Sequence, residues 1–250
     1  MIDERERDIS KSEMIAFFQS VPPQYKQSLG LMGGWAVNFL LEKRGVSHIG
    51  SRDIDIFFDP EKISQQSVVE LIKSRGFSPH STFRWVKFFH WETGKVISEE
   101  EAKKLQSYDQ VRIFLDLAAP TKLDDHVLLE PLLSEVFLGN NEYWKSSNCN
   151  ILMPSIRIMV RIKIKSTPER KDGFKRTKDL ADLLAMLKSE NGLWVISNGR
   201  RTALQNDLRD SHVEVLKDAT KRYRVDGTLT DSCRGVGITF NEALTILQTL

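Results

Sequence analysis

The feature that most constrains the fold is a short apolar run that carries two carboxylates, Asp53-Ile54-Asp55-Ile56-Phe57-Phe58. Its β-branched and aromatic residues predict a β-strand, in which alternate side chains point to opposite faces. Asp53 and Asp55 therefore share one face of this strand. Because unpaired carboxylates are costly to bury, the pair predicts a nearby positive charge, and Mg²⁺ fits because it prefers oxygen ligands. The alternative is a strand end whose acids cap a helix or lie in water.

A glycine pair precedes this strand. Gly33-Gly34 follows the apolar residues 29–32 and comes before an apolar segment, 35–41, that predicts a buried helix. A strand, two glycines and a helix start bring backbone N–H groups close to a phosphate, because glycine permits the tight turn and the helix N-terminus favours negative charge. Glycine pairs also mark ordinary turns, so both interpretations stay open on this feature alone.

A third carboxylate lies inside a second strand pattern. Asp116 is the one acid in the apolar run from Val111 to Pro120. If this strand lies beside the first, three like charges meet on one face and repel each other unless metal ions bridge them. Three acids holding two ions is the arrangement that clamps the attacking and leaving oxygens in phosphoryl-type transfer.

These residues together resemble the nucleotidyltransferase superfamily related to polymerase beta. Gly33-Gly34-Trp35-Ala36 is similar to the opening of the antibiotic nucleotidyltransferases, and the segment 51–56 is similar to the AbiEii-type toxin branch. Three later features are similar to the Lys-x-x-Ser/Thr, Arg and Lys-Asp-x-x-Asp-Leu motifs of that branch. They are Lys163-Ile164-Lys165-Ser166, Arg170 and Lys178-Asp179-Leu180-Ala181-Asp182-Leu183. With these motifs the resemblance reaches about residue 192.

The resemblance implies an α+β fold. A small mixed β-sheet nucleotidyltransferase core flanked by helices is expected over residues 1–120. A mainly helical C-terminal domain over residues 121–250 is expected to complete the nucleotide and acceptor cleft. The implied reaction moves a nucleoside monophosphate from an NTP, ATP among them, to an acceptor hydroxyl. It uses two Mg²⁺ ions, for which Mn²⁺ is an alternative.

The resemblance also implies roles for individual residues. The two ions are assigned to three acids, Asp53, Asp55 and Asp116. The last of these also takes the proton of the acceptor hydroxyl or lowers its pKa. The phosphates of the nucleotide are assigned to backbone, hydroxyl and cationic donors: Gly33, Gly34, Ser51, Arg52 and Lys163.

Three functions remain open at this stage. The first is a toxin-like enzyme that modifies a tRNA 3′ end and is neutralised by an antitoxin partner. The second modifies a small hydroxylated compound such as an antibiotic, which the Gly-Gly-Trp-Ala opening favours slightly. The third binds nucleotide or RNA without catalysis. The segment 157–178 favours RNA, because nine basic residues face two acids there, a local excess of about seven charges in a chain whose net charge is +2.

Other segments give expectations for single elements. Residues 156–165 alternate between apolar and polar side chains as a strand does. Pro154-Ser155 suits a helix start, however, and the resemblance implies a helix, so we predict a helix. Asp59-Pro60 predicts the start of a helix that ends near Gly76, and residues 98–101 predict a capping box. Helices are also expected over residues 128–137, near residues 204–208 and 213–216, and over residues 240–247.

Whole-chain properties exclude some classes. Residues 1–8 are charged and lack the apolar core of a signal peptide, and no apolar run is long enough to span a membrane. The isolated Cys149 and Cys233 argue against a disulfide framework or a zinc knuckle. No membrane partner and a cytoplasmic location are therefore expected.

Overall fold

The computed structural model describes residues 3–146, 148–189 and 210–249. The chain divides into two compact units. Unit 1 comprises Met1–Ala36 and Gly50–Ser155, and unit 2 comprises Val37–Ile49 and Ile156–Leu250. No helix in the described part of the chain combines the length and the apolar character needed to cross a bilayer.

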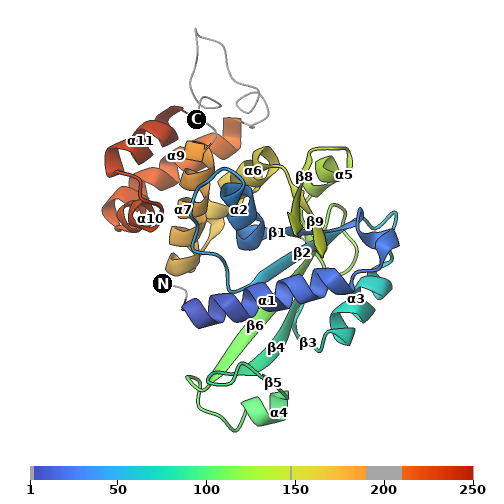
Figure 1. Ribbon diagram of the computed structural model, residues 1–250. Coiled ribbons are helices and arrows are strands. Elements are labelled where there is room, and N and C mark those ends of the chain that lie inside the picture. Colours follow the sequence, from blue (N-terminus) through green and yellow to red (C-terminus); the bar gives the residue numbers. More distant parts are fainter. Residues whose placement is uncertain (1–2, 147, 190–209, 250) are drawn as a thin grey trace. The chain divides into compact units, whose positions relative to one another are not determined.

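Unit 1 is built on a mixed sheet whose strands follow the order β3-β4-β6-β2-β1-β9-β8, with β5 paired to β4 and β7 paired to β6 (Figure 1). The strands are β1 (Leu29–Met32), β2 (Ile54–Phe58), β3 (Ser78–Ser81), β4 (Arg84–His90), β5 (Val96–Ile97), β6 (Gln110–Ala119), β7 (Leu128–Leu129), β8 (Asn141–Ser146) and β9 (Cys149–Pro154). β2 runs parallel to β6, whereas β4 and β6 are antiparallel. The predicted class, a mixed sheet flanked by helices, is confirmed.

The helices of unit 1 are α1 (Glu4–Ser20), the first turn of α2 (Gly33–Glu42), α3 (Gln65–Ser74), α4 (Glu99–Ala102) and α5 (Leu133–Phe137). α1 crosses one face of the sheet and contacts β6 and β9 (Figure 1). It buries Met14 and Phe17 completely. The capping box at Ser98, which opens α4, is confirmed.

Trp35 fixes the start of α2. Its indole is 1% exposed, and its Nε1 donates a hydrogen bond of 2.9 Å to the buried Ser10 Oγ on α1. A buried indole N–H needs such an acceptor, so this bond satisfies the polar end of the largest side chain in the segment. The glycine pair is thereby held at a defined place between β1 and the body of α2.

Two predicted helices begin later than expected. The Asp59 carboxylate accepts from the Glu61 N–H at 3.1 Å and closes a turn, and α3 begins only at Gln65 with Ser64 as its N-cap. The prediction of Asp59 as N-cap is therefore wrong, although the end near Gly76 is confirmed. Of the expected helix over 128–137 only α5 forms, because Leu128–Leu129 pair with β6 as β7.

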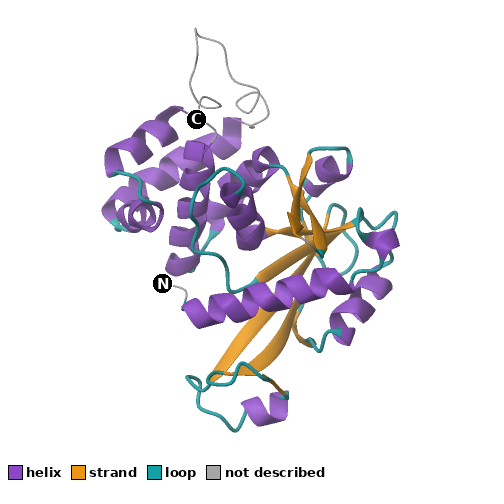
Figure 2. Cartoon of the chain, viewed as in Figure 1, coloured by secondary structure: helices purple, strands orange, loops and turns teal. Residues whose placement is uncertain are grey.

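The described part of unit 2 contains helices and no strand, as Figure 2 shows. They are the rest of α2, α6 (Ile156–Ser166), α7 (Gly173–Ser189), α9 (Asp210–Val225), α10 (Thr228–Val236) and α11 (Phe240–Thr249), with a 3₁₀ turn at Thr167–Glu169. The helices predicted near 213–216 and over 240–247 are confirmed, and the pattern at 204–208 lies outside the described residues.

α6 settles the conflict between strand and helix in favour of the helix. Seven of its eleven residues are buried, among them Lys163. The residues that keep partial exposure include Arg157, Arg161 and Lys165, which recur every four residues as one helical face requires. Burial around most of the helix therefore outweighs the strand preference of its isoleucines.

The predicted functional boundary at residue 120 stays a prediction. Residues 121–155 belong to unit 1, because β8 and β9 join its sheet. Residues 37–49 belong with the second unit, so the chain passes between the units within α2 and again before Gly50.

Candidate functional site

Four residues form a lateral row across the sheet of unit 1. Asp55 on β2 is the register partner of Asp116 on β6, and Asp116 is in turn the partner of Arg84 on β4. On the other side, Asp55 pairs with Met32, the last residue of β1. Because register partners on adjacent strands point to the same face, the two carboxylates and the guanidinium lie side by side. Asp53 stands two residues before Asp55, just ahead of β2.

Arg84 lies at one end of this row and pairs with the carboxylate next to it. Its Nε and Nη2 donate to the two oxygens of Asp116 at 2.7 and 2.5 Å, and its Nη2 also lies 3.8 Å from Asp53 Oδ2. The guanidinium carbon is 4.9 Å from the centre of the Phe114 ring, a cation–π distance. The hydrogen bonds to Asp116, followed by the charges of Asp116, Asp53 and Asp55, raise the pKa of Arg84 above its ordinary value.

No pattern in the sequence distinguishes this arginine. Its role depends on the register of β4 with β6, which the pattern of residues does not specify.

The residues next to Asp53 have different environments. Ser51 is buried, whereas the Arg52 side chain is 43% exposed. Arg52 Nε lies 3.7 Å from Asp53 Oδ1, and its Nη1 lies 3.9 Å from Glu6 on α1. Arg52 is therefore beside the carboxylates and open to solvent, where it can meet a charged ligand.

The glycine pair adjoins the carboxylates directly. Gly33, the residue after Met32, has a φ of +65°, and a Cβ placed on it would lie 1.9 Å from Asp55 Oδ2. Only glycine can combine this backbone conformation with so close an approach of the carboxylate. The turn from β1 into α2, with Gly34 as its next residue, therefore brings a helix N-terminus beside Asp55.

Gly33→Ala is expected to destabilise the protein more than Gly94→Ala does. Gly94 has a φ of +66° with nothing within 4 Å of an added Cβ, so both variants carry the same left-handed strain and only the first displaces Asp55. The difference in unfolding free energy should be about 1–3 kcal/mol, the cost of overpacking. Urea unfolding of the two variants measures it, and equal losses would show that Asp55 does not constrain this turn.

The three carboxylates fit a divalent metal ion by type. They supply the hard oxygen donors that Mg²⁺ prefers. The guanidinium of Arg84 lies among these carboxylates. Within residues 3–146, 148–189 and 210–249, no three His, Cys, Asp or Glu side chains lie close enough together to hold a metal ion. The expected two-ion site therefore stays a prediction.

Lys163 belongs to a different cluster, within unit 2. Its ammonium donates to Asp179 Oδ1 and, at 2.8 Å, to Asp182 Oδ2, both on α7. Arg170 Nε donates to Asp179 Oδ2 at 2.7 Å, and Lys178 Nζ donates to Asp182 Oδ2 at 3.2 Å. These contacts with the two aspartates hold Lys163 and Arg170 in place. The role of Lys163 in nucleotide binding stays a prediction.

This cluster is held in its charged form. Burial by itself lowers the pKa of Lys163, but the charges of Asp179 and Asp182 raise it above its ordinary value. Burial alone would raise the pKa of Asp182, but the charges of Lys163 and Lys178 hold it well below its usual range. A buried ion pair of this kind depends on all of its members, because removing one leaves an uncompensated charge.

His48 is a second residue that the sequence did not point to. Its Nε2 lies 2.7 Å from Asp182 Oδ1, and both side chains are 1% exposed. The bond joins the loop after α2 to α7 within unit 2. Nothing in the loop sequence distinguishes this histidine from the others in the chain, because its partner is 134 positions away.

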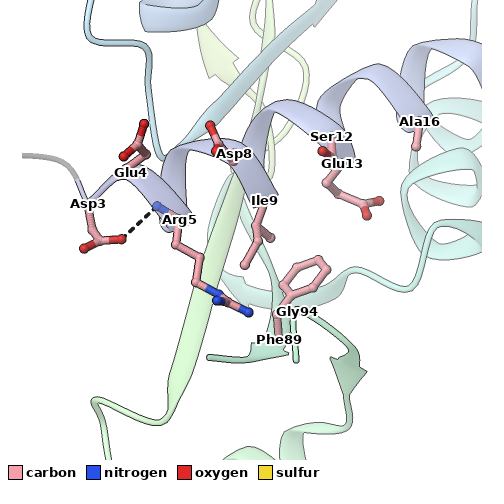
Figure 3. Close-up of a pocket in the computed structure, with 10 residues that line it drawn as sticks. All are labelled: Asp3, Glu4, Arg5, Asp8, Ile9, Ser12, Glu13, Ala16, Phe89 and Gly94. Atoms are coloured by element: carbon pink, nitrogen blue, oxygen red, sulfur yellow. Dashed lines mark hydrogen bonds between the residues drawn. The ribbon is translucent and has the colours of Figure 1, made fainter. Parts of the chain in front are cut away.

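A hollow of about 810 Å³ lies beside α1 in unit 1. Figure 3 shows its wall of α1 side chains, with Phe89 of β4 and Gly94 opposite. The charged side chains of this wall are mainly acidic, because Asp3, Glu4, Asp8 and Glu13 line it together with Arg5. None of the three site carboxylates lines it, and its charge does not suit an anionic nucleotide.

Comparisons with known proteins find similarity at the level of structure. No protein-family model matches the chain, and no curated protein matches it. The structure is similar to the crystal structure of an antigenic nucleotidyltransferase-like protein from Paracoccidioides brasiliensis. The similarity covers 94% of each chain with 14% sequence identity and a TM-score of 0.44. A likeness at this level assigns neither an activity nor a substrate.

Proposed function

We propose that the protein is a metal-dependent nucleotidyltransferase that moves a nucleoside monophosphate from an NTP to an acceptor hydroxyl. The observation that carries the proposal is the register of Asp55 with Asp116 on parallel neighbouring strands, with the Gly33 turn packed against Asp55. Two carboxylates beside a glycine turn and a helix N-terminus join cation-binding groups to phosphate-binding groups in one place.

Each residue has a role that follows from its position. Asp53 and Asp55 provide oxygen ligands, and two Mg²⁺ ions bound there would offset charge on the attacking and leaving oxygens. Asp116 takes the proton of the acceptor hydroxyl. Backbone N–H groups at Gly33 and Gly34 orient the phosphates, and Arg52 offsets part of their charge. Positioning and charge stabilisation carry this reaction, and no covalent enzyme intermediate is needed.

An RNA acceptor, such as a tRNA 3′ end, is the first candidate. The loop between α6 and α7 presents Arg170, which is 46% exposed, and the exposed Lys171. The first turn of α7 adds Phe174, which is 52% exposed. Cations attract a phosphate backbone, and an exposed aromatic ring can stack on an unpaired base. The antitoxin partner and the choice of ATP rest on the family resemblance alone.

A panel of acceptors tests the proposal. The protein is incubated with Mg²⁺ and each α-labelled NTP, together with total tRNA in one series and hydroxylated antibiotics in another. Label transferred to tRNA with release of pyrophosphate is the expected result. Label on an antibiotic would support the small-molecule alternative, and nucleotide binding without pyrophosphate release would support a catalytically silent protein.

Lys171→Ala is expected to weaken binding to single-stranded RNA. Loss of one phosphate contact should lower the slope of log affinity against log salt concentration by about 1. Fluorescence anisotropy with a labelled oligonucleotide at several salt concentrations measures this slope. The matched control is Lys221→Ala on α9, where the lysine side chain is 79% exposed and pairs with Asp218. Equal slopes for the two variants would show that the α6–α7 loop does not contact RNA.

A further inference from the structure

The position of Arg84 raises a question about the proposed metal site. Its guanidinium donates to both oxygens of Asp116 and lies within 3.8 Å of Asp53. Its positive charge therefore lies where the charge of a divalent ion is expected. A doubly charged ion and a guanidinium among the same carboxylates repel each other strongly. Full binding of an ion by Asp116 therefore competes with Arg84.

We propose that Arg84 is the counter-ion of these carboxylates when no metal is bound. When a divalent ion binds Asp116, Arg84 leaves this carboxylate and pairs with a phosphate of the substrate. This inference rests on the proposed function and adds to it a residue and a coupling between two ligands. In the metal-free protein Arg84 relieves the repulsion among three neighbouring acids. In the loaded protein it supplies a positive charge to the nucleotide.

The surroundings of Arg84 suit such an exchange. Its side chain is 22% exposed, so one side of it faces solvent and not the core. Phe114 lies two residues before Asp116 on β6, on the same face, and its ring is 4.9 Å from the guanidinium carbon. The ring can hold the cation after the bidentate bond to Asp116 is broken, because cation–π attraction does not depend on that carboxylate.

The exchange predicts positive coupling between metal and nucleotide. Without nucleotide, an ion must displace a guanidinium from a strong bidentate contact, which weakens binding of the metal. With nucleotide present, the displaced guanidinium gains a phosphate partner. Each ligand should therefore tighten the binding of the other by the same factor, and that factor should fall when Arg84 is replaced.

The test is a titration with Mn²⁺ followed by electron paramagnetic resonance, with and without a non-hydrolysable ATP analogue. Arg84→Met removes the charge and keeps the length of the side chain. It should raise the affinity for Mn²⁺ alone by about tenfold, and the factor by which the analogue tightens Mn²⁺ binding should fall. Arg84→Lys, which cannot form the bidentate contact, should lie between Arg84→Met and the wild type.

Arg112→Met is the matched control. Arg112 lies on β6, 6.0 Å from the centre of the Phe88 ring, and donates to Gln110. This variant should leave Mn²⁺ affinity unchanged. An unchanged or weaker Mn²⁺ affinity in folded Arg84→Met and Arg84→Lys would overturn the inference.

Asp55→Asn distinguishes a failure of the Arg84 inference from a failure of the proposed function. Mn²⁺ binding that requires Asp55 but is insensitive to Arg84 would overturn only the role of Arg84. Absence of Mn²⁺ binding in every variant, or binding that does not require Asp55, would overturn both.

Discussion

Asp116→Asn is expected to lower the rate of nucleotidyl transfer on the order of 10³-fold while keeping much of the affinity for the NTP. The substitution preserves the shape of the side chain but removes the charge and the ability to accept the acceptor proton. Asp53 and Asp55 still hold the side of the site that binds the nucleotide. Asp55→Asn should damage both binding and turnover, because Asp55 lies between Asp116 and the Gly33 turn.

Pyrophosphate release and calorimetric titration with NTP in Mg²⁺ measure the two effects separately. Asp125→Asn, an exposed acid of the same unit, is the control for a general loss of charge. Thermal unfolding shows whether loss of the Asp116 charge beside Arg84 disturbs the fold. Equal losses of NTP affinity in the Asp55 and Asp116 variants would contradict this division of roles.

Lys163→Met is expected to destabilise the protein by about 3–5 kcal/mol, because it leaves Asp179 and Asp182 buried without their shared cation. The two aspartates are 5% and 1% exposed. Lys165→Met, on the same helix at a partly exposed position, is the control and should cost much less. Urea unfolding measures both variants. Similar small losses would mean that the buried cluster does not stabilise α6 against α7.

The pH dependence of stability gives the same prediction a second measurement. Asp179 and Asp182 have pKa values lowered by folding, so their contribution is present above the unfolded pKa of about 3.9 and is lost as the pH falls below it. Lys163 has a raised pKa, so its contribution is present below about 10.4 and is lost above it. Between these limits the cluster should add a constant amount to stability. Lys163→Met should reduce both dependences.

The same two lysine variants test the predicted role of Lys163 toward the nucleotide. A much larger loss of NTP affinity in the Lys163 variant than in the Lys165 variant, at a temperature where both are folded, would support that role. Similar affinities would limit Lys163 to the cluster with Asp179 and Asp182.

Alternation along single strands was enough to predict part of the candidate site. It predicted that Asp53 and Asp55 share one face of a strand and that Asp116 lies inside a second strand, because side-chain direction in a strand depends only on position. Asp55 and Asp116 do lie on β2 and β6, whereas Asp53 precedes β2, which begins at Ile54. The register that places Asp55 beside Asp116 is a property of the tertiary structure. The local pattern predicted that the acids meet only if the two strands are neighbours.

Other features could not be read from local sequence. Arg84 gains its role from the antiparallel register of β4 with β6, and His48 gains its contact from a helix far along the chain. The helix start predicted at Asp59 was wrong because the same carboxylate can close a turn or cap a helix, and here it accepts from Glu61 N–H. The strand-like alternation of α6 was overridden by burial on most of its surface.

The most direct test of the central claim is anomalous diffraction from crystals grown with Mn²⁺ and a non-hydrolysable ATP analogue. Two Mn²⁺ peaks about 3.5–4 Å apart are expected, both bound by Asp53 and Asp55 and one of them also by Asp116, with the phosphates at the Gly33 turn. Mn²⁺ and nucleotide bound elsewhere, with Arg84 still paired to Asp116 and no metal on Asp55, would contradict the proposal that these carboxylates form a nucleotidyl-transfer site.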